Sequence, residues 1–104
     1  MRHYEAMYII DADTPDDILE TTTEKFKKVV TDGGGEVSEA GKWDKGRRPL
    51  AYEIKFNNKK HREGMYLMMQ FTADSEVPKE LDRIFRISDE IVRHLIVRQD
   101  QDEE

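Results

Sequence analysis

The side chains best suited to acid–base or metal chemistry are scattered along this sequence. The histidines His3, His61 and His94 show no metal-ligand spacing to one another or to paired carboxylates. The aspartates at positions 11–17 lack the glycine and glutamate of a calcium-binding loop. The chain has no cysteine that could act as a nucleophile or thiolate ligand. We therefore predict no catalytic residue, no metal site and no cofactor.

Three consecutive glycines at positions 33–35 could in principle cradle a phosphate. Phosphate-binding glycine loops follow a strand and precede a helix. Here the glycines follow a predicted helix, so we interpret them as its end and the turn after it.

Charge gives the clearest candidate for a function. Residues 42–62 contain eight basic and two acidic side chains, a net charge of +6, whereas the whole chain of 104 residues carries −6. Because screening acts over about 10 Å at moderate salt, such a segment can act largely by itself on phosphates or on an acidic protein surface. The alternative is an edge strand whose basic side chains only prevent pairing with other sheets. The candidate binding residues of this segment are Lys42, Trp43, Lys45, Arg47, Arg48, Lys59, Lys60 and Arg62.

Trp43 is the only tryptophan of the chain. It could anchor an interface or pack in the core, and its charged neighbours favour the interface.

The hydrophobic pattern predicts the elements that position these residues. Apolar alternation predicts strands at 1–10, 36–56, 65–71 and 91–97, the second with an edge or bulge at Pro49. Helical spacing predicts one helix from Thr14 to the glycines at 33–35 and another from about Ser75 to Ile87. Thr14 is the expected N-cap, followed by Pro15 at the first helical position. The polar residues 57–64 form the expected turn of a long hairpin with a basic tip.

This order of elements predicts an α+β protein with the ferredoxin-like split β-α-β sandwich (βαββαβ). In that fold a four-stranded antiparallel sheet has two helices on one face, and the other face is available for a partner. We expect the first and last strands to be central. Tyr66, Met68 and Gln70 should lie on the uncovered face, and their segment lacks the aromatic signature of an RNA-recognition motif.

We expect one domain at residues 1–98 and a disordered acidic tail at 99–104. No apolar run approaches the roughly 20 residues of a membrane span, and no signal-peptide pattern is visible. The composition thus fits a cytoplasmic protein with no membrane contact.

Three stretches resemble the bacterial small-subunit ribosomal protein six family. They are Arg2-His3-Tyr4-Glu5, the segment from Trp43 through Gly46-Arg47-Arg48-Pro49-Leu50-Ala51-Tyr52-Glu53-Ile54, and the helix, turn and strand from Phe85 to Val97. The resemblance extends from Met1 to about Arg98. Two departures, Pro49 between the arginines and Leu50 and Glu53 where a proline often stands, alter the bend of the segment.

The resemblance implies a ferredoxin-like fold and no catalysis or small-molecule substrate. It implies a heterodimer with small-subunit ribosomal protein eighteen that binds the central domain of small-subunit ribosomal RNA. Arg2 and Arg93 then join the candidates for RNA or partner contact. The second hypothesis is a small regulatory or ligand-binding domain of the same fold that dimerises through its open sheet face, and an enzyme ranks third.

Overall fold

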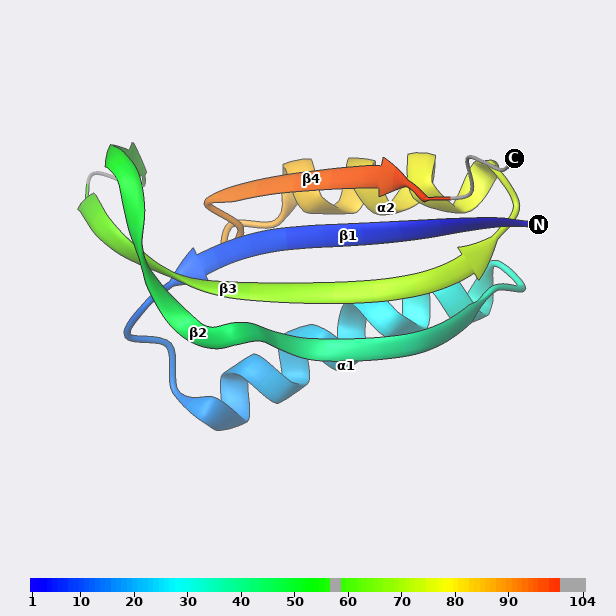
Figure 1. Ribbon diagram of the computed structural model, residues 1–104, viewed down its shortest axis with the longest axis horizontal. Coiled ribbons are helices and arrows are strands. Elements are labelled where there is room, and N and C mark those ends of the chain that lie inside the picture. The colour runs from blue at the N-terminus through cyan, green and yellow to red at the C-terminus, as the bar shows by residue number, and fades with distance from the viewer. Residues whose placement is uncertain (57–58, 100–104) are drawn as a thin grey trace.

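The computed structural model describes residues 1–56 and 59–99, with the side chains of 44–48, 51–52, 56, 59 and 61 outside the description. Within these ranges the chain forms four strands and two helices (Figure 1). In chain order the elements are β1 (Arg2–Asp11), α1 (Asp16–Asp32), β2 (Glu36–Phe56), β3 (Lys59–Ala73), α2 (Glu76–Ile87) and β4 (Arg93–Arg98).

The four strands form one sheet in the order β2-β3-β1-β4, and every neighbouring pair is antiparallel. Both helices lie on the same face of this sheet (Figure 1). The predicted α+β, ferredoxin-like split β-α-β sandwich is therefore confirmed. The expectation that the last strand is central was wrong, because β4 pairs only with β1 and forms an edge.

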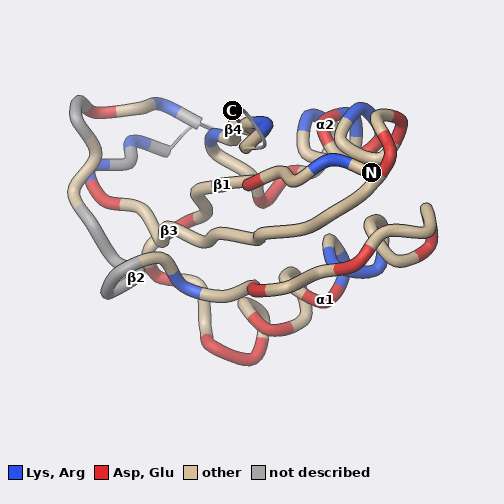
Figure 2. Tube along the Cα trace, turned by 45° about the vertical axis from the view of Figure 1, so that its right-hand side comes forward, with Lys and Arg blue, Asp and Glu red and all other residues tan. Residues whose placement is uncertain are grey.

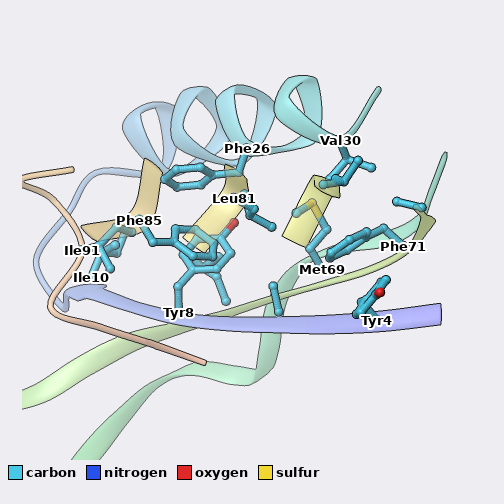
Figure 3. Close-up of a cluster of buried hydrophobic side chains, with 14 of the residues drawn as sticks. Tyr4, Tyr8, Ile10, Phe26, Val30, Met69, Phe71, Leu81, Phe85 and Ile91 are labelled. Atoms are coloured by element: carbon cyan, nitrogen blue, oxygen red, sulfur yellow. The ribbon is translucent and has the colours of Figure 1, made fainter. Parts of the chain in front are cut away.

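The core fills the space between the helices and one face of the sheet (Figure 3). On β1 every second residue points into it, and Tyr4, Ala6, Tyr8 and Ile10 are all buried. Phe26 of α1 reaches down to this layer, with its ring centroid 5.2 Å from that of Tyr8. The predicted alternation of this strand is thus correct, because a sheet covered on one face buries alternate side chains.

The start of α1 differs from the prediction by one position. Pro15, not Thr14, is the N-cap, and its carbonyl accepts hydrogen bonds from the N–H groups of Ile18 and Leu19. The Thr14 hydroxyl instead donates to the carbonyl of Asp11 at 2.7 Å, so it closes the preceding turn and makes no cap.

The buried stripe of α1 differs from the one that its apolar spacing predicts, which is Ile18, Leu19, Phe26, Val29 and Val30. Its buried members are Leu19, Thr22, Phe26 and Val30, whereas Ile18 is 48% exposed. The spacing in α2 predicts a stripe of Val77, Leu81, Ile84 and Phe85, and all of these except the half-buried Ile84 are buried.

The glycines after α1 make the predicted turn. Gly34 has φ of +87°, in the left-handed region where glycine avoids the steric penalty of a side chain. At Gly35 a Cβ atom would lie only 2.7 Å from the backbone oxygen of Thr72, so the chain passes β3 too closely for any side chain.

The hairpin of β2 and β3 is longer than the sequence indicated. Residues 59–64, expected in a polar turn, belong to β3, and the pairing of Phe56 with Lys59 continues the ladder almost to the tip. This two-stranded ribbon extends past the ends of the helices (Figure 1). On β3 the residues from 59 to 63 are all polar, so the apolar alternation that marks a strand is absent there. The expected turn at Asn57 and Asn58 lies outside the described residues.

The two ends of the described chain lie side by side, because β4 pairs with β1 (Figure 1). The backbone N–H of Gln99, the first residue of the predicted tail, donates to the carbonyl of His3 at 2.8 Å. Positions 100–104 of that tail lie outside the described residues. No helix in the described part of the chain is long and apolar enough to cross a membrane.

A first prediction concerns the buried hydroxyl of Tyr8, which has no hydrogen-bond partner among the described residues. Burial raises the pKa of Tyr8, and the side chain of Thr23 offsets part of that increase. Above about pH 10 an unfolded tyrosine ionises while buried Tyr8 keeps its proton, so stability falls as pH rises through this range. We expect Tyr8→Phe to change the free energy of unfolding by less than about 1 kcal/mol at pH 7.

The same variant should lose less stability than the parent chain between pH 9 and pH 11, as measured by urea unfolding. A loss above about 2 kcal/mol at pH 7 would contradict the prediction, since it would reveal a strong hydrogen bond from this hydroxyl.

Candidate functional site

The sheet face opposite the helices has no covering element in the described structure, and we call it the open face. Strand register assigns its side chains, since residues that alternate with the buried ones must point to it. Trp43 joins them through its ring contact with Tyr66. The open face comprises His3, Glu5, Met7, Ile9, Glu36, Glu39, Gly41, Trp43, Tyr66, Met68, Gln70, Thr72, Arg93, Leu95 and Val97.

Apolar side chains concentrate on the β1–β4 side of the open face. Leu95 is 61% exposed and Val97 is 43% exposed, although both are aliphatic. Leu95 lies opposite Met7 in the strand register, and Val97 lies opposite Glu5. Exposed apolar groups gathered in one place on a small domain mark a surface that a partner covers.

An aromatic pair lies on the β2–β3 side of the same face. The ring centroids of Trp43 and Tyr66 are 6.0 Å apart, and both residues are half-buried. Next to Tyr66 on this face, Met68 is only 7% exposed. Trp43 therefore lies outside the main core, in the position that suits an interface anchor. Its role in binding stays a prediction.

The hairpin of β2 and β3 brings most of the predicted basic residues together. Lys60 and Arg62 are exposed on β3, and the Arg62 Nε donates to the Glu53 carboxylate across the ribbon at 2.8 Å. This hydrogen bond, and then the charge of Glu53, raise the pKa of Arg62. The pair leaves most of the Arg62 side chain accessible, since it is 85% exposed.

Four further candidates lie on the same ribbon with only their backbone described. Arg47 pairs with Met65 and Arg48 with Gly64, while Lys59 pairs with Phe56 near the tip. Lys45 lies in the irregular part of β2, between Lys42 and Arg47. The prediction that these side chains meet phosphate or an acidic surface falls outside the described part of the structure.

Arg2 and Arg93 lie at opposite ends of the sheet. Arg93 is exposed on the open face and pairs with Ile9, close to the hairpin end of β1. Arg2 pairs with Ala73 at the other end, about 25 Å along β1 at the usual rise per residue. Arg2 also shares its face with Tyr4, so only Arg93 belongs to the open face. In this register Arg93 and His94 point to opposite faces, because Arg93 pairs with Ile9 and His94 pairs with Tyr8.

Lys42 lies on the helix side of the sheet, away from the open face. Its Nζ is 3.4 Å from the Asp16 carboxylate at the start of α1. Figure 2 shows this neighbourhood, where acidic positions in the first turns of α1 lie beside β2. The structure thus separates Lys42 from the other candidates.

His3 and His94 make ordinary structural contacts. His94 is half-buried, with its Nε2 2.7 Å from the Asp82 carboxylate and its ring 5.1 Å from that of Phe85. The Nδ1 of His3 lies 3.0 Å from the Thr72 hydroxyl. No group of three or more metal-binding side chains occurs within residues 1–56 and 59–99.

Sequence reasoning did not single out Leu95 and Val97. A signal was present, because the strand from Arg93 to Arg98 has apolar residues at both odd and even positions. A strand that is apolar on both faces predicts burial on both faces. Here the helices cover only the face that holds Ile96.

Comparison with known proteins gives a consistent result. The family described as Ribosomal protein S6 matches residues 3–98 of the chain. The small ribosomal subunit protein bS6 of Clostridium acetobutylicum is 47% identical over 97 residues, which cover 93% of this chain and 96% of that protein. The protein of the same name from Desulforudis audaxviator is 46% identical over 100 residues, covering 96% of this chain and all of the relative.

A solved structure agrees with the sequence relatives. The crystal structure of 30S ribosomal protein S6 from Thermotoga maritima superposes with a TM-score of 0.81 at 32% identity. The match covers 94% of this chain and 87% of the other.

Proposed function

The chain belongs to the ribosomal protein S6 family, and we propose that it joins small-subunit ribosomal protein eighteen and the central domain of ribosomal RNA in one complex. As a member of this family it is a constituent of the small ribosomal subunit, and its place of action is the ribosome in the cytoplasm. The family consists of structural ribosomal proteins and is not a class of enzymes. Within the platform of the subunit, the proposed role is to support assembly.

One observation carries this proposal: the sheet face opposite the helices exposes a patch of aliphatic side chains next to an aromatic pair. Leu95, Val97, Trp43 and Tyr66 together offer the apolar centre that a protein interface needs. Arg93 at the edge of this patch offers a charged group for the polar rim. A folded protein partner fits this surface better than single-stranded bases, because the stacking signature on β3 is absent.

The charge distribution supports binding of different partners by two parts of the molecule. Residues 42–62 carry +6 while the whole chain carries −6, so the remainder is strongly acidic. An acidic body complements a basic ribosomal protein, and a basic ribbon complements RNA phosphates. The acidic body repels RNA, so we expect the isolated chain to bind RNA weakly and the complex to bind it tightly.

The test is a filter-retention assay with a central-domain ribosomal RNA fragment, this chain and protein eighteen, alone and together, at several salt concentrations. We expect tight retention of this chain only in the three-component mixture. The double variant Arg47→Ala with Arg48→Ala should weaken this retention about tenfold or more. It should also reduce the slope of log affinity against log salt concentration by the amount that corresponds to about two phosphate contacts.

The matched control removes two arginines from α2, where Arg83 and Arg86 pair with acidic neighbours on the same helix. Arg83→Ala with Arg86→Ala makes the same change in net charge away from the ribbon, and should leave retention within about threefold. Equal losses in the two double variants would refute a specific role for the ribbon. If this chain stays unbound in every mixture, the proposal fails, and dimerisation through the open face becomes the leading hypothesis.

A further inference from the structure

A groove of about 480 Å³ lies between α1 and the edge strand β2, on the side of the sheet away from the open face. Its floor is apolar and comes from Leu19, Ala40 and Leu67, of which Leu19 and Leu67 are buried. The volume falls in the range of sites that hold one or a few side chains. The groove therefore combines a buried apolar floor with room for a side chain from outside.

Three carboxylates line the helix wall of this groove. Asp16, Glu20 and Glu24 succeed one another at intervals of four residues, so they lie in one row along α1. Lys42 reaches Asp16 at 3.4 Å, and Lys27 reaches Glu24 at 3.3 Å. Glu20, between them, has no ion-pair partner among the described residues. Like charges at this spacing destabilise a helix, so a cation beside Glu20 would relieve repulsion.

The opposite wall of the groove belongs to a sheet edge, since β2 is the outermost strand. Its contribution to the groove is Ala40, Gly41 and Lys42. The two glutamates of this part of β2, Glu36 and Glu39, pair with open-face residues of β3 and point away from the groove. An extended segment can add to such an edge and place alternate side chains over the groove.

We propose that the α1–β2 groove is a docking site for an extended basic segment of a partner protein. A lysine or arginine side chain lays its aliphatic stem on Leu19 and Leu67, and its charge meets Glu20 and Glu24. The backbone of the segment runs along the edge of β2. The row of carboxylates on the helix wall repels nucleic acid, so it selects protein over RNA at this place.

A second groove, of about 450 Å³, lies between α2 and β4, and its charge differs from that of the α1–β2 groove. The ionisable side chains that line it are Lys79, Asp82, His94 and Arg98, so its charge is mixed and positive in balance. It lacks the row of carboxylates that favours a cation. Of these two grooves, only the α1–β2 groove has an excess of negative charge on its walls.

The test uses a ten-residue peptide of alternating lysine and valine, titrated into the ¹⁵N-labelled full-length chain. We expect the largest amide shifts at Leu19, Glu20, Thr23, Ala40 and Gly41. Glu20→Gln with Glu24→Gln should weaken binding about fivefold or more. The matched control, Asp17→Asn with Glu76→Gln, changes the net charge equally at exposed sites outside the groove and should change binding less than twofold.

Equal weakening in both double variants would overturn the proposal, because it would reveal attraction to net charge alone. Shifts confined to the open face or to the hairpin would also overturn it, as would the absence of binding at millimolar peptide. An unchanged amide spectrum of each variant without peptide shows that the fold is intact. The assay contains neither RNA nor protein eighteen, so its failure and the failure of the proposed function are distinguishable.

Discussion

Phe26→Ala should lower the free energy of unfolding by about 3–5 kcal/mol, which is a large share of the 5–15 kcal/mol typical of a domain. Phe26 is fully buried, and its ring lies 4.7 Å from that of Phe85 and 5.2 Å from that of Tyr8. These three rings join α1, α2 and β1, so truncation leaves a cavity at the point where the layers meet (Figure 3). Urea unfolding followed by far-ultraviolet circular dichroism measures the loss.

The control for this variant is on the same helix. Ile18→Ala removes a large apolar side chain that is 48% exposed, and should cost less than about 1 kcal/mol. If the two variants lost similar amounts, the aromatic cluster would not be the centre of the core.

Leu95→Asp should weaken assembly of the three-component ribosomal complex by about 30-fold or more, equivalent to about 2 kcal/mol. The side chain of Leu95 is 61% exposed on the open face, so the isolated chain tolerates the change. In an interface, the new carboxylate would be buried without a partner. The assay is the filter-retention experiment, with the stability of the isolated variant measured separately.

Ile87→Asp is the matched control, since Ile87 is 64% exposed at the end of α2 and away from the open face. The same substitution there should leave assembly within about threefold. Normal assembly of the Leu95 variant would contradict a covered open face. An equal loss in the Ile87 variant would indicate that the partner contacts the helix side of the molecule.

The elements with a strong internal pattern could be predicted from the sequence. The alternation through Tyr4 and Tyr8 fixed which face of β1 is buried, because the side-chain period of a strand is two residues. The stripe from Val77 to Phe85 identified α2 by the same kind of local rule. The order of elements then left few topologies, and the observed one is among them.

Features that depend on distant parts of the chain could not be predicted. The polar residues at 59–64 form a strand only because β2 pairs with them, and no local sequence pattern predicts that pairing. The edge position of β4 is a property of the whole sheet. The α1–β2 groove exists because Glu20 and Ala40 come together from separate elements. The N-cap of α1 was predicted at Thr14, one residue too early. The prediction failed because the Thr14 hydroxyl donates to the carbonyl of Asp11 instead of accepting from the helix.

The pairing of β4 with β1 affects how the chain folds while it is being synthesised. The contact between Gln99 and Glu5 joins residues 94 positions apart, so closing the sheet is one of the longest-range events the chain can undergo. While synthesis proceeds from the N-terminus, β1 can pair with β3 once residue 73 has emerged. Its other edge stays unpaired until residues 93–98 follow. During that interval a nascent chain displays an incomplete sheet, and chains truncated before residue 93 should be more sensitive to protease than the full chain of 104 residues.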